Sequence, residues 1–398
     1  MSDIKTICLK AFDDKFGTKP QMQEYAPGRV NIIGEHTDYN GGFVLPCAIK
    51  YGTCMVAKEN GTNKMRILAV DMNNDYDEFE IASKIEKHPS KLWVNYLRGV
   101  TYQLAQKFGD KVKGLDIAIK GDVPPGAGLS SSASLEVCFG HLVSSAFGLN
   151  VPLMDIALMG QAAEAYIGMK CGIMDQAISA NGTVDHLVRI DCKSYGLTQV
   201  AVPKDLVILI INSNIKHQLV GSEYNDRRES CEKAASIMGV PLLRDATMEM
   251  LEKFKDKMDD VTYRRARHVI TEDQRVLDAS KAFESGDLKT LAKLMYASHV
   301  SMRDDFEITV KETDALVEIV KEALGEEYAA VRQTGGGFGG CVVAVVEPKN
   351  VQKVKDAVNA KYKAVSSINN NIFETTTCAG ATFTKKKKKK LAKVIFKV

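Results

Sequence analysis

The segment that most constrains this chain is residues 121–136, GDVPPGAGLSSSASLE, in which prolines, glycines and serines are concentrated. It follows the largely apolar run Leu115–Ile119 and precedes apolar residues at helical spacing over 135–143. Prolines and glycines favour turns, whereas the runs on either side favour regular structure. This order predicts a strand, a tight loop and a helix that begins near Ser130.

The predicted loop has the properties of an anion site. Gly126 and Gly128 lack the Cβ atoms that would keep a ligand away from the main chain, and they tolerate positive φ angles. The helix that follows adds unpaired N–H groups and the positive end of its dipole. The serine hydroxyls can cap this helix, bind phosphate oxygens or complete the shell of Mg²⁺. Because similar loops also cap helices without a ligand, the residues alone leave both interpretations open.

Length and composition limit the class of protein. A chain of 398 residues favours two domains, and a hydrophobic content of 45% supplies ample core. There is no run of about 18 apolar residues, and residues 1–16 carry charges where a secretory signal needs an apolar stretch. The nine cysteines include no Cys-x-x-Cys pair, which argues against a disulfide framework and a zinc site. We therefore expect a cytoplasmic protein without a membrane segment.

The charge is unevenly distributed along the chain. Eight lysines, with no acidic residue among them, lie at 385–390, 393 and 397, and removing these eight from the net charge of +3 leaves −5. A nucleic-acid-binding protein needs a basic face on its folded body, so we expect no nucleic acid as a partner. Residues 383–398 are expected to form a basic, disordered tail.

A second informative stretch is residues 26–46, APGRVNIIGEHTDYNGGFVLP. Its β-type run Val30–Ile33 leads into a polar cluster that contains Glu35, His36 and Asp38. Two carboxylates and an imidazole this close together can hydrogen-bond several vicinal hydroxyls, which is how proteins hold a sugar. A solvated polar turn would have the same composition, so this interpretation also stays open.

A third glycine-rich stretch is residues 331–346, VRQTGGGFGGCVVAVV. It satisfies the spacing Gly-x-Gly-x-x-Gly, but a dinucleotide site needs a helix after the glycines, and residues 341–346 favour a strand. A protein kinase would also need HRD and DFG sequences, and neither occurs here. The glycines are better suited to a strand-loop-strand junction that packs closely against a nucleotide.

Together these stretches resemble the GHMP small-molecule kinases, and the galactokinases among them. Residues 124–133 match the GHMP phosphate-loop pattern Pro-x-x-x-Gly-Leu-x-Ser-Ser-Ala, and no lysine follows as in a Walker A loop. Residues 28–46 resemble the galactokinase signature, residues 171–176 (CGIMDQ) resemble a second galactokinase stretch, and 335–340 match the third GHMP motif. The motifs lie in the family order, and the resemblance extends from about residue 20 to about 380.

The resemblance implies roles for individual residues. It implies that Asp175 is the general base and that Arg29 lies between this base and the transferred phosphoryl group. The residues implied to bind the sugar are Glu35, His36, Thr37, Asp38 and Tyr224. Those implied to hold the phosphates of ATP are Gly126, Ala127, Gly128, Leu129, Ser130, Ser131 and Ser132.

Further implied positions concern the metal and the adenine. Ser132 and Glu164 are the implied ligands of Mg²⁺, and Trp93 and Asn95 are candidates near the adenine. Taken without the resemblance, each of these residues has an ordinary structural interpretation. Glu164 fits an exposed helix carboxylate and Trp93 fits core packing, just as Asp175 fits a helix cap.

The resemblance also implies the fold and the reaction. The expected fold class is α+β, with residues 1–203 in a domain of the ribosomal-protein-S5-domain-2-like type that contains a left-handed β-α-β crossover. Residues 204–382 are expected to form a ferredoxin-like domain, with the active site in the cleft between the two. The implied reaction is ATP-dependent phosphorylation of galactose at its anomeric hydroxyl by a monomer. An N-acetylgalactosamine kinase and a catalytically silent sugar-sensing regulator are the alternatives.

Overall fold

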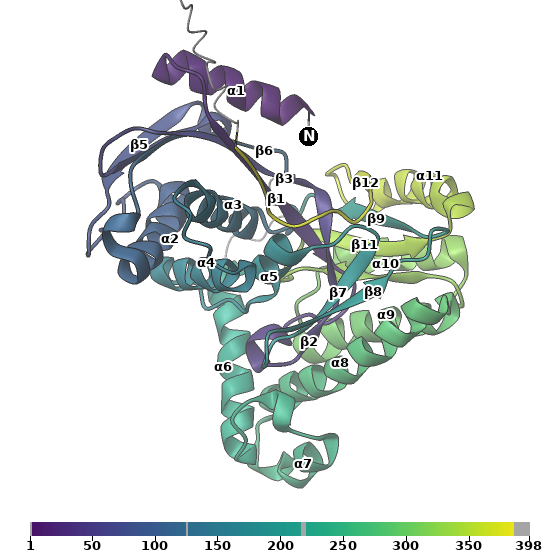
Figure 1. Ribbon diagram of the computed structural model, residues 1–398. Coiled ribbons are helices and arrows are strands. Elements are labelled where there is room, and N and C mark those ends of the chain that lie inside the picture. The colour runs from purple at the N-terminus through teal and green to yellow at the C-terminus, as the bar shows by residue number, and fades with distance from the viewer. Residues whose placement is uncertain (1, 125, 216–219, 386–398) are drawn as a thin grey trace, which may run out of the picture.

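The computed structural model describes residues 2–124, 126–215 and 220–385, which fold into two α+β halves (Figure 1). The fold class expected from the sequence is therefore confirmed. The first half is built on a sheet with the strand order β13-β1-β3-β6-β4-β5. In that order its strands are Thr382–Lys385, Met22–Asn31, Pro46–Glu59, Leu115–Gly121, Lys64–Ala69 and Asp75–Glu80. The parallel neighbours β4 and β6 are connected through β5 and α2.

Helices cover both faces of this sheet because its central strands are apolar on both faces. In β3, Cys54 and Val56 pack under α1, whereas Met55 and Ala57 belong to the core cluster on the opposite face. This alternation is the period of two that a pleated strand imposes. The helices of this half are α1 (Ser2–Phe16), α2 (Leu92–Phe108), α3 (Ser131–Ala146), α4 (Leu153–Ile167) and α5 (Met174–Asn181).

A small sheet follows, and it joins the first half to the second. It has the order β2-β7-β8, from Phe43–Val44, His186–Asp191 and Gly196–Ala201. The loop between β8 and the next strand contains Pro203, where the sequence suggested a domain boundary. That boundary stays a prediction.

The second half contains a sheet with the order β10-β11-β9-β12, and all of its neighbouring strands are antiparallel. Numbered along the chain, this spatial order is 2-3-1-4, which is the ferredoxin-like arrangement. The strands are β9 (Val207–Asn212), β10 (Ala330–Thr334), β11 (Cys341–Val346) and β12 (Asn371–Thr375). The helices are α6 (Val220–Met238), α7 (Met248–Lys253), α8 (Asp260–Ser285), α9 (Leu288–Ser301), α10 (Lys311–Leu324) and α11 (Val351–Lys361).

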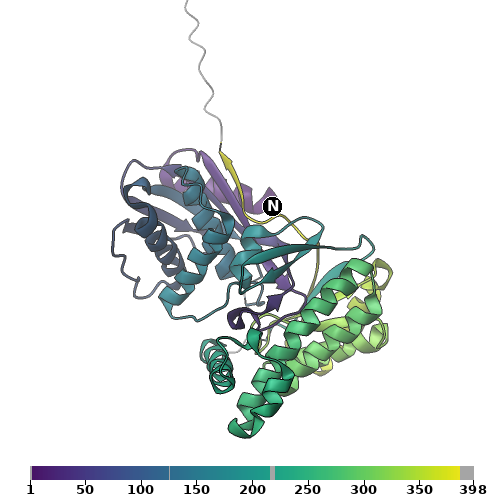
Figure 2. The same ribbon diagram turned by 60° about the horizontal axis from the view of Figure 1, so that its bottom comes forward.

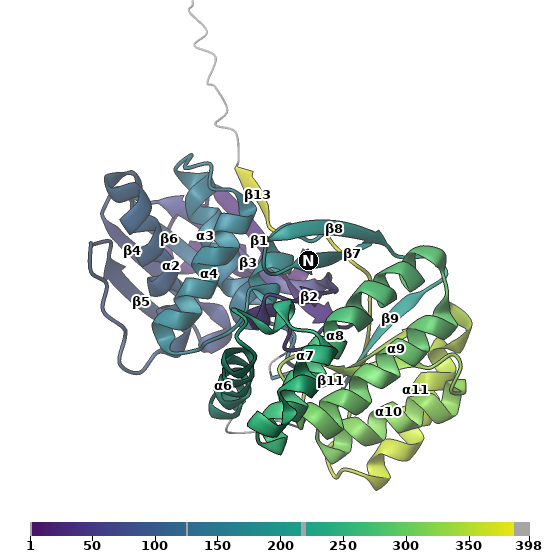
Figure 3. The same cartoon turned by 90° about the horizontal axis from the view of Figure 1, so that it is seen from below.

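The two halves share part of their hydrophobic core. One cluster joins Val30 and Leu45 of the first half to Val276 and Val343 of the second. Figure 3 shows α2, α3 and α4 gathered on one side and α8 to α11 on the other, with α6 near the junction. Because apolar side chains of both halves are buried together, the relative position of the halves is fixed by packing as well as by the connecting chain.

One expectation about the end of the chain is wrong. Residues 383–385, assigned to the tail from the sequence, belong to strand β13, which pairs antiparallel with Met22–Tyr25 of β1. Figure 2 shows this short yellow strand at the edge of the purple sheet. The physical reason is that β1 would otherwise present an unpaired edge, and Phe383 packs its ring against the core of the first half. Residues 386–398 of the expected tail lie outside the described residues.

Over residues 2–124, 126–215 and 220–385, no helix combines the length and the apolar character needed to span a membrane.

Strand β13 is expected to contribute measurably to the stability of the first half. We expect Phe383→Ala to lower the free energy of unfolding by roughly 1–2 kcal/mol, because the ring is half-buried rather than fully buried. Urea denaturation measures this change. Thr384→Ala, at an exposed position of the same strand, is the matched control and should leave the midpoint almost unchanged. Equal effects of the two substitutions would contradict the proposed packing.

Candidate active site

A cavity of about 350 Å³ lies where the two halves meet, and most of the predicted site residues line it. Those that do are Arg29, Glu35, His36, Asp38, Gly126, Gly128, Leu129, Ser130, Ser131, Ser132, Glu164, Asp175 and Tyr224. Its volume is within the range of small-molecule sites. Segments more than 300 residues apart along the chain are therefore brought together, since Gly335 and Gly336 complete the wall.

Arg29 reaches the cavity because of an irregularity in β1. The register between β1 and β3 shifts between Pro27 and Arg29, as in a β-bulge, which re-aims the side chains beside it. Gly28 is required at this point, since a Cβ there would lie 2.6 Å from the carbonyl oxygen of Leu129. The main chain of β1 is thus pressed directly against the phosphate loop.

The guanidinium of Arg29 holds the predicted base. Its Nε donates to Asp175 Oδ1 at 2.7 Å and one terminal nitrogen donates to Oδ2 at 2.9 Å. The other terminal nitrogen donates to the carbonyl oxygen of Gly128 at 2.7 Å. A bidentate pair of this kind fixes the plane of the carboxylate as well as its position. Only 5% of the Arg29 side chain is exposed, whereas 31% of the Asp175 side chain is exposed, so the carboxylate remains accessible.

Asp175 lies in the first turn of α5 and accepts a third hydrogen bond from a second partner. Ser130, the residue before α3, donates its hydroxyl to Asp175 Oδ2 and does not cap the helix. Ser130 has a φ of +61°, a left-handed conformation that is uncommon for residues other than glycine. The phosphate loop and the predicted base are therefore joined through Ser130 as well as through Arg29.

Successive residues of the phosphate loop alternate between exposed and buried positions. Ala127 and Leu129 pack into the core shared by the two halves, whereas Gly126 and Gly128 are exposed. Both glycines have a φ of +69°, which explains why residues without a side chain occupy these positions. Helix α3 begins at Ser131, as expected, so its first N–H groups have no partner within the helix. Ala127 does not line the cavity, and only its main chain is suited to contact a nucleotide.

Glu164 faces Ser132 from the adjacent helix α4. Burial raises the pKa of Glu164 to about 7, while a hydrogen bond from the Ser132 hydroxyl acts in the opposite direction. Behind it, burial raises the pKa of Glu136 well above its ordinary value, and the Gln176 amide donates to this carboxyl at 2.9 Å. A carboxylate and a hydroxyl beside a phosphate loop are oxygen ligands of the kind that Mg²⁺ takes in proteins.

The segment between β1 and β2, residues 32–42, is called the sugar-signature loop, and its Asp38 lines the cavity. The Asp38 carboxylate accepts hydrogen bonds from the N–H groups of Tyr39 at 3.0 Å and Met174 at 3.3 Å. Burial and, secondarily, the negative charge of Asp175 raise the pKa of Asp38 to about 6. Gly172 is in contact with it, since a Cβ on Gly172 would lie 2.0 Å from a carboxylate oxygen. The segment before the predicted base thus packs against the sugar-signature loop.

His36 forms an aromatic corner of the same cavity. Its Nε2 donates to the carbonyl oxygen of Gly336 at 3.2 Å, so Nδ1 accepts from the Tyr39 hydroxyl at 2.8 Å. Its ring lies 4.8 Å from that of Tyr224 and 4.8 Å from that of Phe306. Burial lowers the pKa of His36 to about 3, so the ring is neutral near pH 7.

Two of the predicted sugar contacts have different surroundings. Tyr224 lines the cavity, and its hydroxyl is hydrogen-bonded to the main chain of Gly172. Thr37 does not line the cavity: it is fully buried, and its hydroxyl lies within hydrogen-bonding distance of the carbonyl oxygens of Gly34 (3.0 Å) and Phe43 (2.6 Å). Thr37 therefore shapes the loop and does not face a ligand.

A second cavity, of about 610 Å³, adjoins the phosphate loop through Ser131 and Ser132. Trp93 lines it, and the indole nitrogen donates to Asp75 at 3.0 Å. Asn95, the other adenine candidate, does not line it, and its amide is bonded to the main chain of His88. An apolar cavity beside a phosphate loop is the expected place for a nucleotide base, so Trp93 remains a candidate and Asn95 does not.

Several residues that hold the site were missed in the sequence. His268 and Glu272 of α8 bond to the main chain of Glu35 and Gly34 at 3.1 and 2.9 Å, and Asp273 accepts from the N–H of Phe43 at 2.7 Å. The sequence signal was weak: several charged residues of α8 share the helix face that also carries its buried apolar residues. Such a pattern suggests paired charges without naming their partners.

Three family models match this chain. They are the galactokinase galactose-binding signature over residues 10–59, the GHMP kinases N terminal domain over 95–183 and the GHMP kinases C terminal over 279–364. Solved structures of the same fold include Methanococcus jannaschii mevalonate kinase, with a TM-score of 0.62 and 18% identity over 90% of this chain and 98% of that chain. Homoserine kinase from Cytophaga hutchinsonii matches with a TM-score of 0.62 and 14% identity over 92% and 98%.

The fold, with a phosphate loop set against a buried arginine and an accessible carboxylate, is that of a GHMP small-molecule kinase. A more similar structure is that of Lactococcus lactis galactokinase complexed with galactose, at 34% identity and a TM-score of 0.90. This match covers 96% of this chain and 99% of the lactococcal chain. The chain belongs to the galactokinase family and is a sugar kinase.

The contact between Asp273 and the sugar loop predicts a pH dependence of stability. Burial raises the pKa of Asp273 from 3.8 to about 7. Between these values the unfolded chain has lost the proton that the folded chain keeps, so stability falls as the pH rises through this window. Asp273→Asn can still accept from Phe43 and should remove this fall, which amounts to on the order of 2 kcal/mol between pH 5 and 7.

Denaturant unfolding of both proteins across this pH range measures the difference. Asp278→Asn, at a half-exposed position of the same helix, is the control and should retain the wild-type pH profile. Parallel profiles of the wild type and Asp273→Asn would contradict the buried, protonated state of Asp273.

Proposed function

We propose that this protein transfers the γ-phosphoryl group of ATP to the anomeric hydroxyl of galactose. One observation carries the proposal: the sugar-signature side chains Glu35, His36 and Asp38 open into the same cavity as the phosphate loop and Asp175. The similarity to a galactokinase that was crystallised with galactose supports this choice of sugar.

In this proposal Asp175 is the general base. Its carboxylate is accessible from the cavity and is fixed by Arg29, so it can accept the proton of a hydroxyl placed beside it. Arg29 also contacts the phosphate loop, and its positive charge offsets the negative charge that develops on the transferred group. Phosphoryl transfer passes through a loose transition state, so positioning and charge neutralisation supply most of the catalysis.

The nucleotide is proposed to lie across the two cavities. Its phosphates would rest on the main chain of residues 126–132 and on the first N–H groups of α3. Its base would enter the adjoining cavity beside Trp93. The γ-phosphate would then point toward Arg29 and Asp175.

We propose Mg²⁺ as the metal, held by Ser132 and Glu164. Among the described residues, no group of three or more His, Cys, Asp or Glu side chains is arranged to hold a metal ion. This fits Mg²⁺, which takes only one or two protein ligands and completes its shell with phosphate oxygens and water. When bound, the ion neutralises charge on the β- and γ-phosphates.

The cellular setting is part of the same proposal. The nine cysteines are all described and all free, which suits a reducing compartment such as the cytoplasm. Every residue of the proposed site comes from one chain, so a monomer is sufficient for the reaction.

The test is an assay of ADP release and of sugar 1-phosphate with galactose or N-acetylgalactosamine as the acceptor. We expect turnover with galactose, a rate at least about tenfold lower with the N-acetyl sugar, and loss of turnover when Mg²⁺ is chelated. Faster turnover with N-acetylgalactosamine would show that this sugar, and not galactose, is the preferred substrate. Binding of galactose and ATP without ADP release would indicate a sugar-sensing regulator and not an enzyme.

Asp175→Asn tests the base directly. The substitution keeps the shape of the side chain but removes its capacity to accept a proton, so we expect kcat to fall by about 10³-fold or more. Affinity for ATP, measured by calorimetry, should change little. Retention of wild-type kcat would refute the role of Asp175, whereas loss of ATP binding would point to a structural role.

A further inference from the structure

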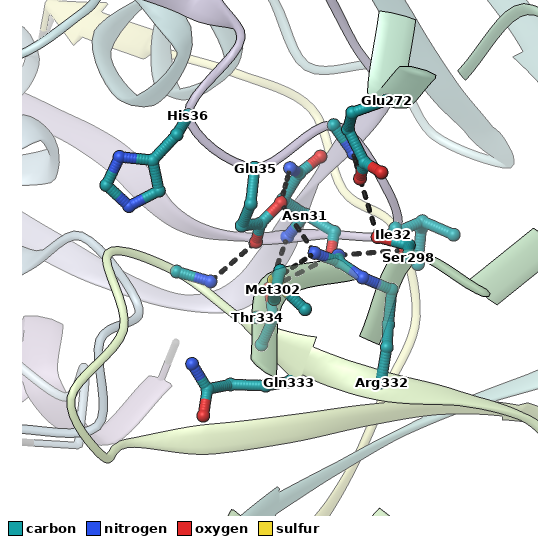
Figure 4. A network of polar contacts seen from close by, with 12 residues as sticks. Asn31, Ile32, Glu35, His36, Glu272, Ser298, Met302, Arg332, Gln333 and Thr334 are labelled. Atoms are coloured by element: carbon teal, nitrogen blue, oxygen red, sulfur yellow. Dashed lines mark hydrogen bonds and ion pairs between the residues drawn. The ribbon is translucent and has the colours of Figure 1, made fainter. Parts of the chain in front are cut away.

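Arg332 is a charged residue in the centre of a buried strand. Strand β10 is buried throughout, and the Arg332 side chain has no exposed surface. Its guanidinium donates to the carbonyl oxygens of Asn31 at 3.3 Å and Ile32 at 3.1 Å. It also lies 3.1 Å from Glu35 Oε2 (Figure 4). An arginine of the second half thus reaches across to the sugar-signature loop of the first.

The Glu35 carboxylate is held by one main-chain N–H group and two side chains. Its Oε1 accepts from the N–H of Gly335 at 2.6 Å, and its Oε2 takes Arg332 together with the side-chain amide of Asn31. Burial raises the pKa of Glu35, and the positive charge of Arg332 is the largest influence that opposes this. A buried carboxylate without such a partner would either become protonated or turn away from the cavity.

We propose that Arg332 is the positioning residue for sugar binding, because its guanidinium pairs with the Glu35 carboxylate and holds it oriented into the cavity. This inference rests on the proposed function of Glu35 as a sugar contact. It assigns a share of sugar recognition to the ferredoxin-like half, through a residue that does not line the cavity.

Other contacts between the halves do not offer the same explanation. His268 and Glu272 bond to the main chain of the loop, and Thr334 bonds to the N–H and carbonyl groups of Asn31. These groups fix the path of the backbone. Among the described residues, Arg332 is the arginine or lysine that is ion-paired with Glu35. The guanidinium therefore acts directly on the carboxylate, together with the N–H of Gly335, whereas His268, Glu272 and Thr334 act on the backbone of the loop.

The experiment is a double-mutant cycle between Arg332 and Glu35 in the full chain. The variants are Arg332→Met, Glu35→Gln and the double substitution, with Arg332→Lys as the conservative change. For each we measure kcat, the KM for galactose, the KM for ATP and the galactose Kd by calorimetry without nucleotide. Arg98→Met is the matched control, because Arg98 is also largely buried and pairs with the buried carboxylate of Asp77 at 2.7 Å, away from the cavity.

We expect Arg332→Met to raise the KM and Kd for galactose about tenfold or more, with the KM for ATP changed less than about twofold. In the Glu35→Gln background the same substitution should add less than about threefold, because the carboxylate that it positions is gone. Arg332→Lys keeps the charge but loses the planar fork, so it should fall between the wild type and Arg332→Met. Arg98→Met should lower the Tm and leave galactose binding unchanged.

Two results would overturn the inference. The first is an equal effect of Arg332→Met on galactose binding with and without Glu35. The second is a loss of stability without a change in galactose affinity for both Arg332→Lys and Arg332→Met. If Arg332→Met does not fold, the same two outcomes are judged from Arg332→Lys and from the double variant. The double variant has no Glu35 carboxylate, so it does not bury an unpaired negative charge. Turnover of galactose by the wild type is measured first, so failure of the proposed function is recognised separately.

Discussion

The geometry of the site depends on the ion pair between Arg29 and Asp175. Arg29 comes from a bulge in a strand, Asp175 from the first turn of α5, and the second partner of the guanidinium is Gly128 of the phosphate loop. One side chain therefore sets the distance between the predicted base and the phosphates. Because a bidentate pair fixes orientation as well as distance, the reacting groups are arranged before any substrate arrives.

A second constraint is that the sugar-signature loop places several ionisable side chains in the protein interior. Glu35 and His36 are buried and Asp38 is half-buried, and groups of this kind are unfavourable in a protein interior unless they are paired or neutral. The structure uses both solutions. Glu35 is paired with Arg332, while His36 is neutral near pH 7 because burial lowers its pKa. The loop can therefore present polar groups to a sugar only while the second half is packed against it.

The sequence was most informative where the signal is local. The glycines and serines of residues 121–136 were sufficient to predict a tight loop and the start of α3, whereas its assignment as a phosphate loop came from the family resemblance. Whether a motif residue faces the ligand is decided by packing, so Thr37 and Ala127 could not be separated from their neighbours. Partners more than 200 residues away, such as Arg332 and Asp273, leave no local pattern. The pairing of Phe383 with β1 was hidden for the same reason.

The third glycine-rich motif also has a physical role that its spacing did not reveal. Gly335 has a φ of +89°, and a Cβ at this position would lie 3.0 Å from the carbonyl oxygen of Gly128. Its N–H donates to Glu35 at 2.6 Å. A single residue without a side chain thus touches the phosphate loop on one side and a proposed sugar contact on the other. Because no side chain intervenes, the main chain of the third motif packs directly between the phosphate loop and Glu35.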